Sequence, residues 1–164
     1  MNNLLILNIV RFFLFLGLQV LVLQQMIFGP ILGEYLRGFI YPLFLLLLPF
    51  RTSVEILMLV GFAMGIAVDT MYGTFGVHAS ASVGLMAFRG TILNQIQPKG
   101  KYNLNKGLTP ANYPLNWFLS YLGISYALFT LWLSILEVFQ IWRVGTILLR
   151  ALFMFPISIF FIFI

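Results

Sequence analysis

Few side chains in this chain of 164 residues could do chemistry, since it holds only four acidic residues and one histidine. His78 and Asp69 are the base and acid types of a hydrolytic triad. Ser80 or Ser82 would be the nucleophile, but both are too near His78 in sequence to imply more than adjacency, and no Gly-x-Ser-x-Gly elbow occurs. One histidine cannot supply the paired histidine ligands of a zinc site, and no glycine-rich phosphate loop is present. We therefore expect a protein that is not an enzyme and that holds no metal ion or cofactor.

Asp69 belongs instead to a pattern of small residues. Gly61, Gly65 and Asp69 are spaced four apart, which places them on one face of a helix. Glycines at this spacing let a second backbone approach closely inside lipid. A glycine-rich turn follows at residues 72–76, and a run rich in alanine and serine begins at Ala79. The pattern predicts a tight helical hairpin in the membrane, with one buried carboxylate near its turn.

The composition indicates a membrane protein, because 62% of the residues are hydrophobic and only 8% are charged. Soluble domains are about 45–50% apolar and about 25% charged. No cysteine is present, which excludes disulfides and thiolate metal sites. We predict one all-helical domain over residues 1–164, a compact bundle of about six transmembrane helices. The apolar runs that we interpret as spans are 4–28, 39–49, 56–68, 79–88, 117–137 and 142–164. The second run is short for a span and contains Pro42, so it either starts earlier, near Tyr35, or is a tilted or broken helix.

Basic residues indicate the orientation of this bundle. Six spans would leave a polar loop at residues 94–116 on the same side as both termini. That side would carry Arg11, Arg51, Arg89, Lys99, Lys101 and Lys106, and the other side Arg37 and Arg143. Because loops in the cytoplasm carry an excess of lysine and arginine, we expect the amino terminus and the 94–116 loop to be cytoplasmic. The formal net charge of +5 then suits anionic lipid headgroups, and we expect no nucleic-acid partner.

Seven polar residues fall in the outer half or at the outer rim of this predicted bundle: Glu34, Arg37, Asp69, His78, Glu137, Arg143 and Arg150. Arg150 would lie about 12 Å below the outer end of its helix, at ~1.5 Å per residue. An arginine at that depth should face the interior of the bundle and pair with an acid, here Asp69 or Glu137. Two interpretations stay open: a structural set of ion pairs, or a polar cavity that faces outward and receives a ligand or a partner helix. His78 is expected to be hydrogen-bonded at the turn.

The hairpin sequence resembles one known family. The stretch LLLLPFRTS followed by LVGFAMGIAVDTMYGTFGVHASA is similar to the MreD family of bacterial rod-shape-determining membrane proteins. In that family a proline ends one helix, a Gly-xxx-Gly helix ends in aspartate, and a glycine-containing turn leads into a small-residue helix. The matching positions are Pro49, Gly61, Gly65, Asp69, Gly73, Gly76 and Ala79. A second stretch, FTLWLSILEVF, resembles the family's aromatic-rich helix that closes in a carboxylate, here Glu137.

The resemblance implies a function that composition does not. It implies a non-enzymatic scaffold of the cell-wall elongation machinery in the bacterial cytoplasmic membrane, which binds MreC and works with MreB and the peptidoglycan synthases. Membrane lipid is then an expected partner, and no small-molecule substrate is expected. The alternative is the substrate-binding membrane subunit of an energy-coupling-factor vitamin transporter, which has a similar size of six helices. Those subunits typically present paired alanines on the first helix, where this chain offers only Gly17.

Overall fold

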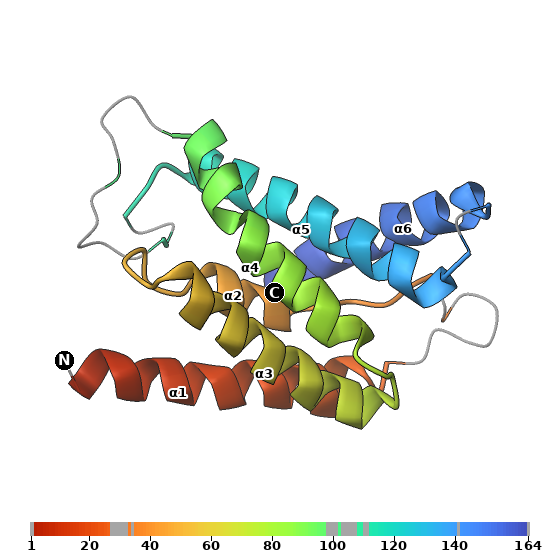
Figure 1. Cartoon of the computed structure of the whole chain (residues 1–164), viewed down its shortest axis with the longest axis horizontal. Helices are drawn as coiled ribbons and strands as arrows, with labels where there is room; N and C mark the ends of the chain where they lie inside the picture. Colours follow the sequence, from red (N-terminus) through yellow and green to blue (C-terminus); the bar gives the residue numbers. More distant parts are fainter. Residues whose placement is uncertain are drawn as a thin grey trace.

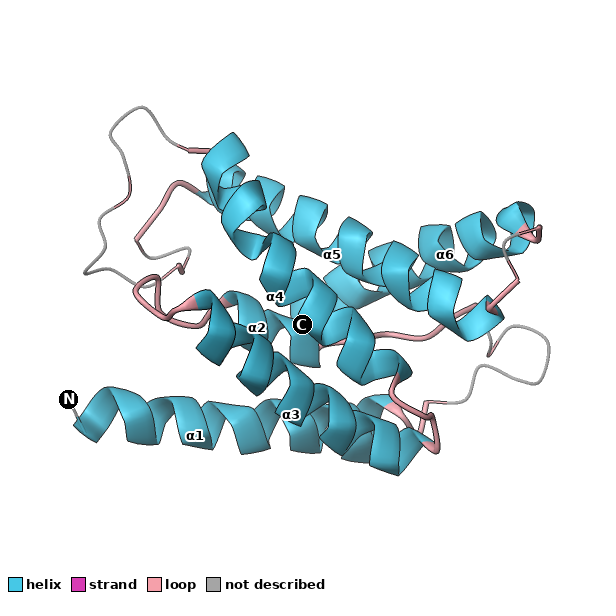
Figure 2. Ribbon diagram, in the orientation of Figure 1, coloured by secondary structure: helices cyan, strands magenta, loops and turns pink. Residues whose placement is uncertain are grey.

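The structure is a computed structural model that describes residues 2–26, 33, 35–97, 102, 108–109, 112–140 and 142–163. Over these residues the chain is all-helical, with six helices (Figures 1 and 2). The first, α1, continues directly into a π-helical segment, η1. The elements in chain order are α1 (Asn2–Gly17), η1 (Leu18–Leu23), α2 (Tyr41–Leu46), α3 (Val54–Tyr72), α4 (Val77–Gln95), α5 (Leu115–Val138) and α6 (Val144–Ile162).

Four helices have the length and apolar composition of a membrane span. They are the α1–η1 helix through Ile6–Leu23, then α3, α5 and α6. The chain is therefore a multi-pass membrane protein. Among the described residues, two of the six predicted spans do not form a helix of this length and composition. The second, α2, has six residues, or ~9 Å of helix at 1.5 Å per residue, which is too short to cross a bilayer. The fourth, α4, has 19 residues but is too polar in composition to belong with the four.

The α3–α4 hairpin is the best-defined part of the fold, and its turn depends on two glycines. Gly73 ends α3 with φ 68°, and Gly76 precedes α4 with φ 78°. Both values lie in the left-handed region that glycine adopts without steric cost. At the other end of α3, Glu55 lies in the first turn, where a carboxylate interacts favourably with the helix dipole. The predicted hairpin is thus present, with its turn at the predicted glycines.

The helices pack as two antiparallel hairpins with α1 along one side. In Figure 1, α4 lies between α3 and α5, α6 returns beside α5, and α1 runs beside α3. We call the end of the bundle with the α3–α4 and α5–α6 turns the turn end. The opposite end, where residues 47–53 connect α2 to α3, we call the loop end. The amino terminus of α1 lies at the loop end (Figure 1).

The core surrounds α2, whose six residues are all buried. Residues 36–40 approach it without helical structure, so the second predicted span is broken: an unwound segment followed by a short helix. The alternative that this run forms a broken helix is therefore the correct one. The largest fully buried side chains near α2 are aromatic and come from the segment before α2, from α2 itself and from α5: Phe39, Tyr41, Tyr121, Tyr126 and Phe129.

The predicted polar loop at residues 94–116 is bounded by helix ends close to those positions, because α4 ends at Gln95 and α5 begins at Leu115. Much of it, including Lys99, Lys101 and Lys106, lies outside the described residues. Two described residues pack onto the bundle, although a solvent loop was expected. Leu108 is fully buried, and the Tyr102 hydroxyl donates a hydrogen bond of 2.7 Å to the carbonyl of Leu93.

Candidate functional site

The glycine face of α3 lies directly against the backbone of α4. A Cβ atom placed on Gly65 would lie 2.3 Å from the Cα of Ala79, and one on Gly61 would lie 3.1 Å from the carbonyl oxygen of Ser82. Real Cβ atoms essentially never approach other atoms as closely as the first value. The close helix contact predicted from the four-residue spacing is therefore present, and it is tightest near the turn.

Asp69 closes this contact by capping the amino terminus of α4. Its two carboxylate oxygens accept hydrogen bonds from the backbone N–H groups of His78 (3.1 Å) and Ala79 (2.9 Å), and one of them also accepts from the hydroxyl of Thr74. The residue is 3% exposed. The first N–H groups of a helix lack internal partners and carry partial positive charge, so they can balance a buried carboxylate. Asp69 is the predicted buried acid, and it accepts hydrogen bonds from N–H and hydroxyl groups.

His78 lies in the first turn of α4 and joins the hairpin to α2. It is fully buried, and its Nδ1 lies 3.2 Å from the hydroxyl of Tyr41. Its ring also packs against Phe39 and Tyr72, at centroid distances of 5.3 Å in both cases. Because Asp69 holds the backbone N–H of His78 and not its ring, the arrangement is not that of a hydrolytic triad.

Two polar side chains hold the amino-terminal side of α2. Gln19, which is fully buried within η1, accepts the backbone N–H of Ile40 at 2.9 Å and donates to the carbonyl of Gly38 at 3.2 Å. Ser158 of α6, also fully buried, accepts the N–H of Phe39 at 3.0 Å. Unwound backbone is tolerated at membrane depth only where such groups are satisfied by protein or water. These two residues therefore stabilise the break before α2.

Arg89 and Tyr121 hold the other side of α2. Arg89 is 2% exposed and donates through Nη2 to the carbonyl oxygens of Leu46 (3.5 Å) and Leu48. Its Nε donates to the hydroxyl of Tyr121 at 3.1 Å, and that hydroxyl donates to Leu46 at 3.2 Å. The carbonyl end of a helix carries partial negative charge, which suits an arginine. Arg89 is thus a buried residue of α4 that supports α2, and it does not lie in a loop.

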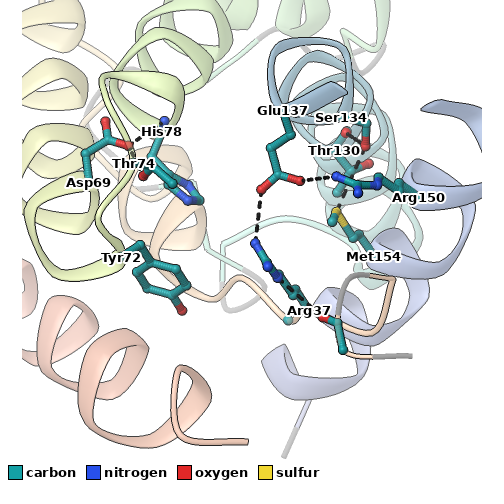
Figure 3. A network of polar contacts seen from close by, with 12 residues as sticks. Arg37, Asp69, Tyr72, Thr74, His78, Thr130, Ser134, Glu137, Arg150 and Met154 are labelled. Atoms are coloured by element: carbon teal, nitrogen blue, oxygen red, sulfur yellow. Dashed lines mark hydrogen bonds and ion pairs between the residues drawn. The ribbon is translucent and has the colours of Figure 1, made fainter. Parts of the chain in front are cut away.

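A second polar cluster lies at the turn end and includes Arg150. Glu137 contacts two arginines, with Oε1 3.3 Å from Nη1 of Arg37 and Oε2 3.3 Å from Nη1 of Arg150. Figure 3 shows this cluster opposite the group formed by Asp69 and His78. Of the two acids considered for Arg150, Glu137 is the one that pairs with it. The ion pair therefore joins α5 to α6 and to the segment before α2.

An open cavity of about 380 Å³ adjoins this cluster at the turn end. Arg37, Glu137 and Arg150 form part of its wall, and Thr74 and Phe75 of the α3–α4 turn form another part. Glu137 and Arg150 are largely buried, whereas the Arg37 side chain is 39% exposed. A polar cavity open at the turn end is therefore present beside the ion pairs. The structural set of ion pairs and the polar cavity, which were two separate interpretations of these residues, occur together.

The remaining predicted positions and the residues that sequence reasoning missed can now be placed. Pro49 lies three residues after the end of α2 and opens the turn that leads to α3, where its carbonyl accepts the N–H of Thr52 at 3.3 Å. Gln19, Arg89 and Ser158 were not recognised as sites. Each is a polar residue within an apolar helix, and such residues in a membrane protein usually face the bundle interior and have a specific partner.

Comparisons with protein families, with curated proteins and with solved structures found no match to this chain.

Proposed function

We propose that this protein is a non-enzymatic scaffold subunit of the bacterial cell-wall elongation machinery, located in the cytoplasmic membrane and binding MreC. The observation that carries the proposal is the α3–α4 hairpin. The positions that resemble the MreD family act together there: Gly61 and Gly65 allow contact with α4, and Asp69 caps it. Gly73 and Gly76 shape the turn between the two helices. The positions that resemble the family are thus the ones that pack, cap and turn the α3–α4 hairpin.

The use of the buried polar groups supports a scaffold. Asp69, Gln19 and Arg89 all form hydrogen bonds with backbone groups of other elements. Glu137 joins three segments through its ion pairs with Arg37 and Arg150. Groups held in this way fix the relative positions of helices, as expected for a protein whose role is to present a rigid surface to partners.

For the orientation, we propose that the loop end is cytoplasmic. Arg89 no longer belongs in the positive-inside count, because it is buried against α2. The loop-end side still has an excess of basic residues, with Arg11, Arg51, Lys99, Lys101 and Lys106 against Arg37 and Arg143. Cytoplasmic loops carry such an excess. The cavity beside Glu137 then opens toward the outer side of the membrane.

Co-purification tests this function. The protein would be co-expressed with MreC from the same organism, extracted in mild detergent and isolated through a tag on this chain. We expect MreC to be recovered with the parent protein and with Gly123→Leu. We expect it to be lost with Gly65→Leu, because Gly65 meets α4 whereas no atom lies within 4 Å of a Cβ on Gly123. Equal recovery with all three proteins, or none with the parent, would contradict the scaffold proposal.

The cavity at the turn end favours a second candidate, the substrate-binding subunit of a vitamin transporter. Its volume of about 380 Å³ falls in the range of small-ligand pockets, roughly 300–1,000 Å³. Arg37 and Arg150 supply hydrogen-bond donors that suit a carboxylate or phosphate group of a ligand. Mass analysis of small molecules retained by the same purified protein separates the two functions. A bound vitamin without MreC would favour the transporter.

A further inference from the structure

A groove runs along the side of the bundle between α1 and α3. Its volume is about 470 Å³. Phe12 and Phe13 of α1 form one wall, and Val60 and Ala63 of α3 form the other. Phe44 of α2 lies in the groove between the two walls. Since α1 and α3 both belong to the candidate spans, this groove faces the hydrocarbon of the membrane.

The groove is closed at the turn end by hydrogen bonds between its two walls. Gln24 donates through Nε2 to the carbonyl of Met71 at 2.8 Å, and Gln19 donates to the hydroxyl of Tyr72 at 2.7 Å. At the loop end, where α1 and α3 both begin, no side-chain hydrogen bond joins the described residues of the two walls (Figure 1). The groove is therefore a slot with one closed end and one end that reaches the membrane surface.

Polar residues gather at the end that reaches the surface. Asn8 and Thr52 line the groove there, near the amino termini of α1 and α3. Arg51, which is exposed, lies between the lining residues Pro49 and Thr52. The nearest acid in the sequence, Glu55, does not line the groove. An apolar slot with hydrogen-bonding groups and a cation at its mouth matches the shape and charge of an anionic lipid.

The volume indicates what fits inside. An apolar cavity of about 150 Å³ holds one benzene, which has six carbons. The groove, at about 470 Å³, is roughly three times larger and has room for about eighteen carbons, which is one acyl chain. A transmembrane helix ~10 Å wide and ~27 Å long fills about 2,000 Å³. A partner helix could therefore lie over the groove but could not enter it.

We infer that the groove binds one acyl chain of an anionic phospholipid from the leaflet at the loop end, with its phosphate held by Arg51, Asn8 and Thr52. Lipid tails are as apolar as the groove, so hydrophobicity alone gives no preference for this place over the bulk membrane. Shape retains the chain, and Arg51 selects the headgroup. The inference does not depend on the proposed scaffold function, because it uses only the groove and its mouth.

Native mass spectrometry can test the site. The delipidated protein would be incubated with mixed micelles of equal phosphatidylglycerol and phosphatidylcholine, and the bound lipids counted after mild activation. We expect one tightly held phosphatidylglycerol on the parent. Ala63→Phe fills the slot and should abolish this tight binding. Ala127→Phe, the same change at an exposed position of α5 outside the groove, should retain it.

The headgroup is tested by two matched arginine variants. Arg51→Gln should lower the preference for phosphatidylglycerol about fivefold, as expected for one arginine near an anionic surface. Arg143→Gln, at the turn end, should leave the preference unchanged. If Ala63→Phe lowers the melting temperature relative to Ala127→Phe, Ile9→Trp fills the slot from the opposite wall and decides instead.

Two results would overturn the inference. The first is tight lipid retention that both slot-filling variants leave at the parent level. The second is lipid binding without preference between the two headgroups, which indicates ordinary boundary lipid. If Ala63→Phe released a co-purified membrane protein and left lipid retention unchanged, the groove would be a docking face for a helix, and the lipid assignment would be wrong.

Discussion

Replacing Gly65 by alanine is the smallest change that tests the packing of the α3–α4 hairpin. The added Cβ would lie 2.3 Å from the Cα of Ala79, whereas ordinary van der Waals contact begins at 3.4 Å. The two helices must therefore separate by about 1 Å at this point, as the difference between these two distances shows. Both atoms belong rigidly to their backbones, so no side-chain rotation can relieve the overlap. The separation also pulls the N–H of Ala79 away from Asp69, which accepts it at 2.9 Å.

The size of the effect follows from two opposing terms. Overpacking in a well-packed interior costs about 1–3 kcal/mol. Alanine is favoured over glycine inside a helix by about 0.8–1.0 kcal/mol in soluble hosts, which offsets part of that cost. Gly61→Ala meets the Ser82 carbonyl at 3.1 Å and needs a shift of only a few tenths of an ångström, so its two terms should nearly cancel. Gly123→Ala meets no atom within 4 Å and should be neutral or stabilising.

The assay is thermal unfolding in a mild detergent, with the three variants and the parent compared at the same protein and detergent concentrations. We expect the melting temperatures to fall in the order Gly123→Ala, Gly61→Ala, Gly65→Ala, with only the last clearly below the parent. Membrane insertion should be equal in all three, because alanine inserts as readily as glycine. A Gly65→Ala protein as stable as Gly123→Ala would show that α3 and α4 do not approach as closely as described.

Three further predictions concern charged residues and orientation. Arg150→Leu and Glu137→Ala together should lose less stability than the sum of their separate losses, since each change alone leaves a partner charge in place. The losses of Arg150→Leu and Asp69→Ala should add, and coupling between these two would refute the assigned pairing. Arg89→Met should destabilise the protein by about 1–3 kcal/mol for each buried carbonyl left without a donor, as measured by detergent unfolding, and a neutral effect would contradict its role at α2. Thr74→Cys should react with an impermeant maleimide in intact spheroplasts, because the turn end is expected to be outside; protection of this cysteine until the membrane is opened would reverse the orientation.

The hairpin could be predicted from the sequence because its determinants are local. A four-residue spacing fixes which residues share a helix face, and a glycine-rich turn fixes where the chain reverses. The partner of Arg150 could be narrowed to two acids but not chosen. The choice depends on what else each acid binds: the oxygens of Asp69 accept N–H groups at the start of α4, while those of Glu137 face two arginines.

The break before α3 was one of the alternatives that the short run with Pro42 left open, but the residues that stabilise it could not be predicted, because they are distant in sequence. Residues 39–49 are almost entirely apolar, and such a run suits an intact helix as well as a broken one. A break exposes backbone N–H and C=O groups, each of which costs several kcal/mol if left without a partner in lipid. Gln19 satisfies one side of α2 from η1, and Arg89 satisfies the other from α4. Only the fold brings these two helices to α2, so the polar residues that stabilise the break could not be identified from the segment that breaks.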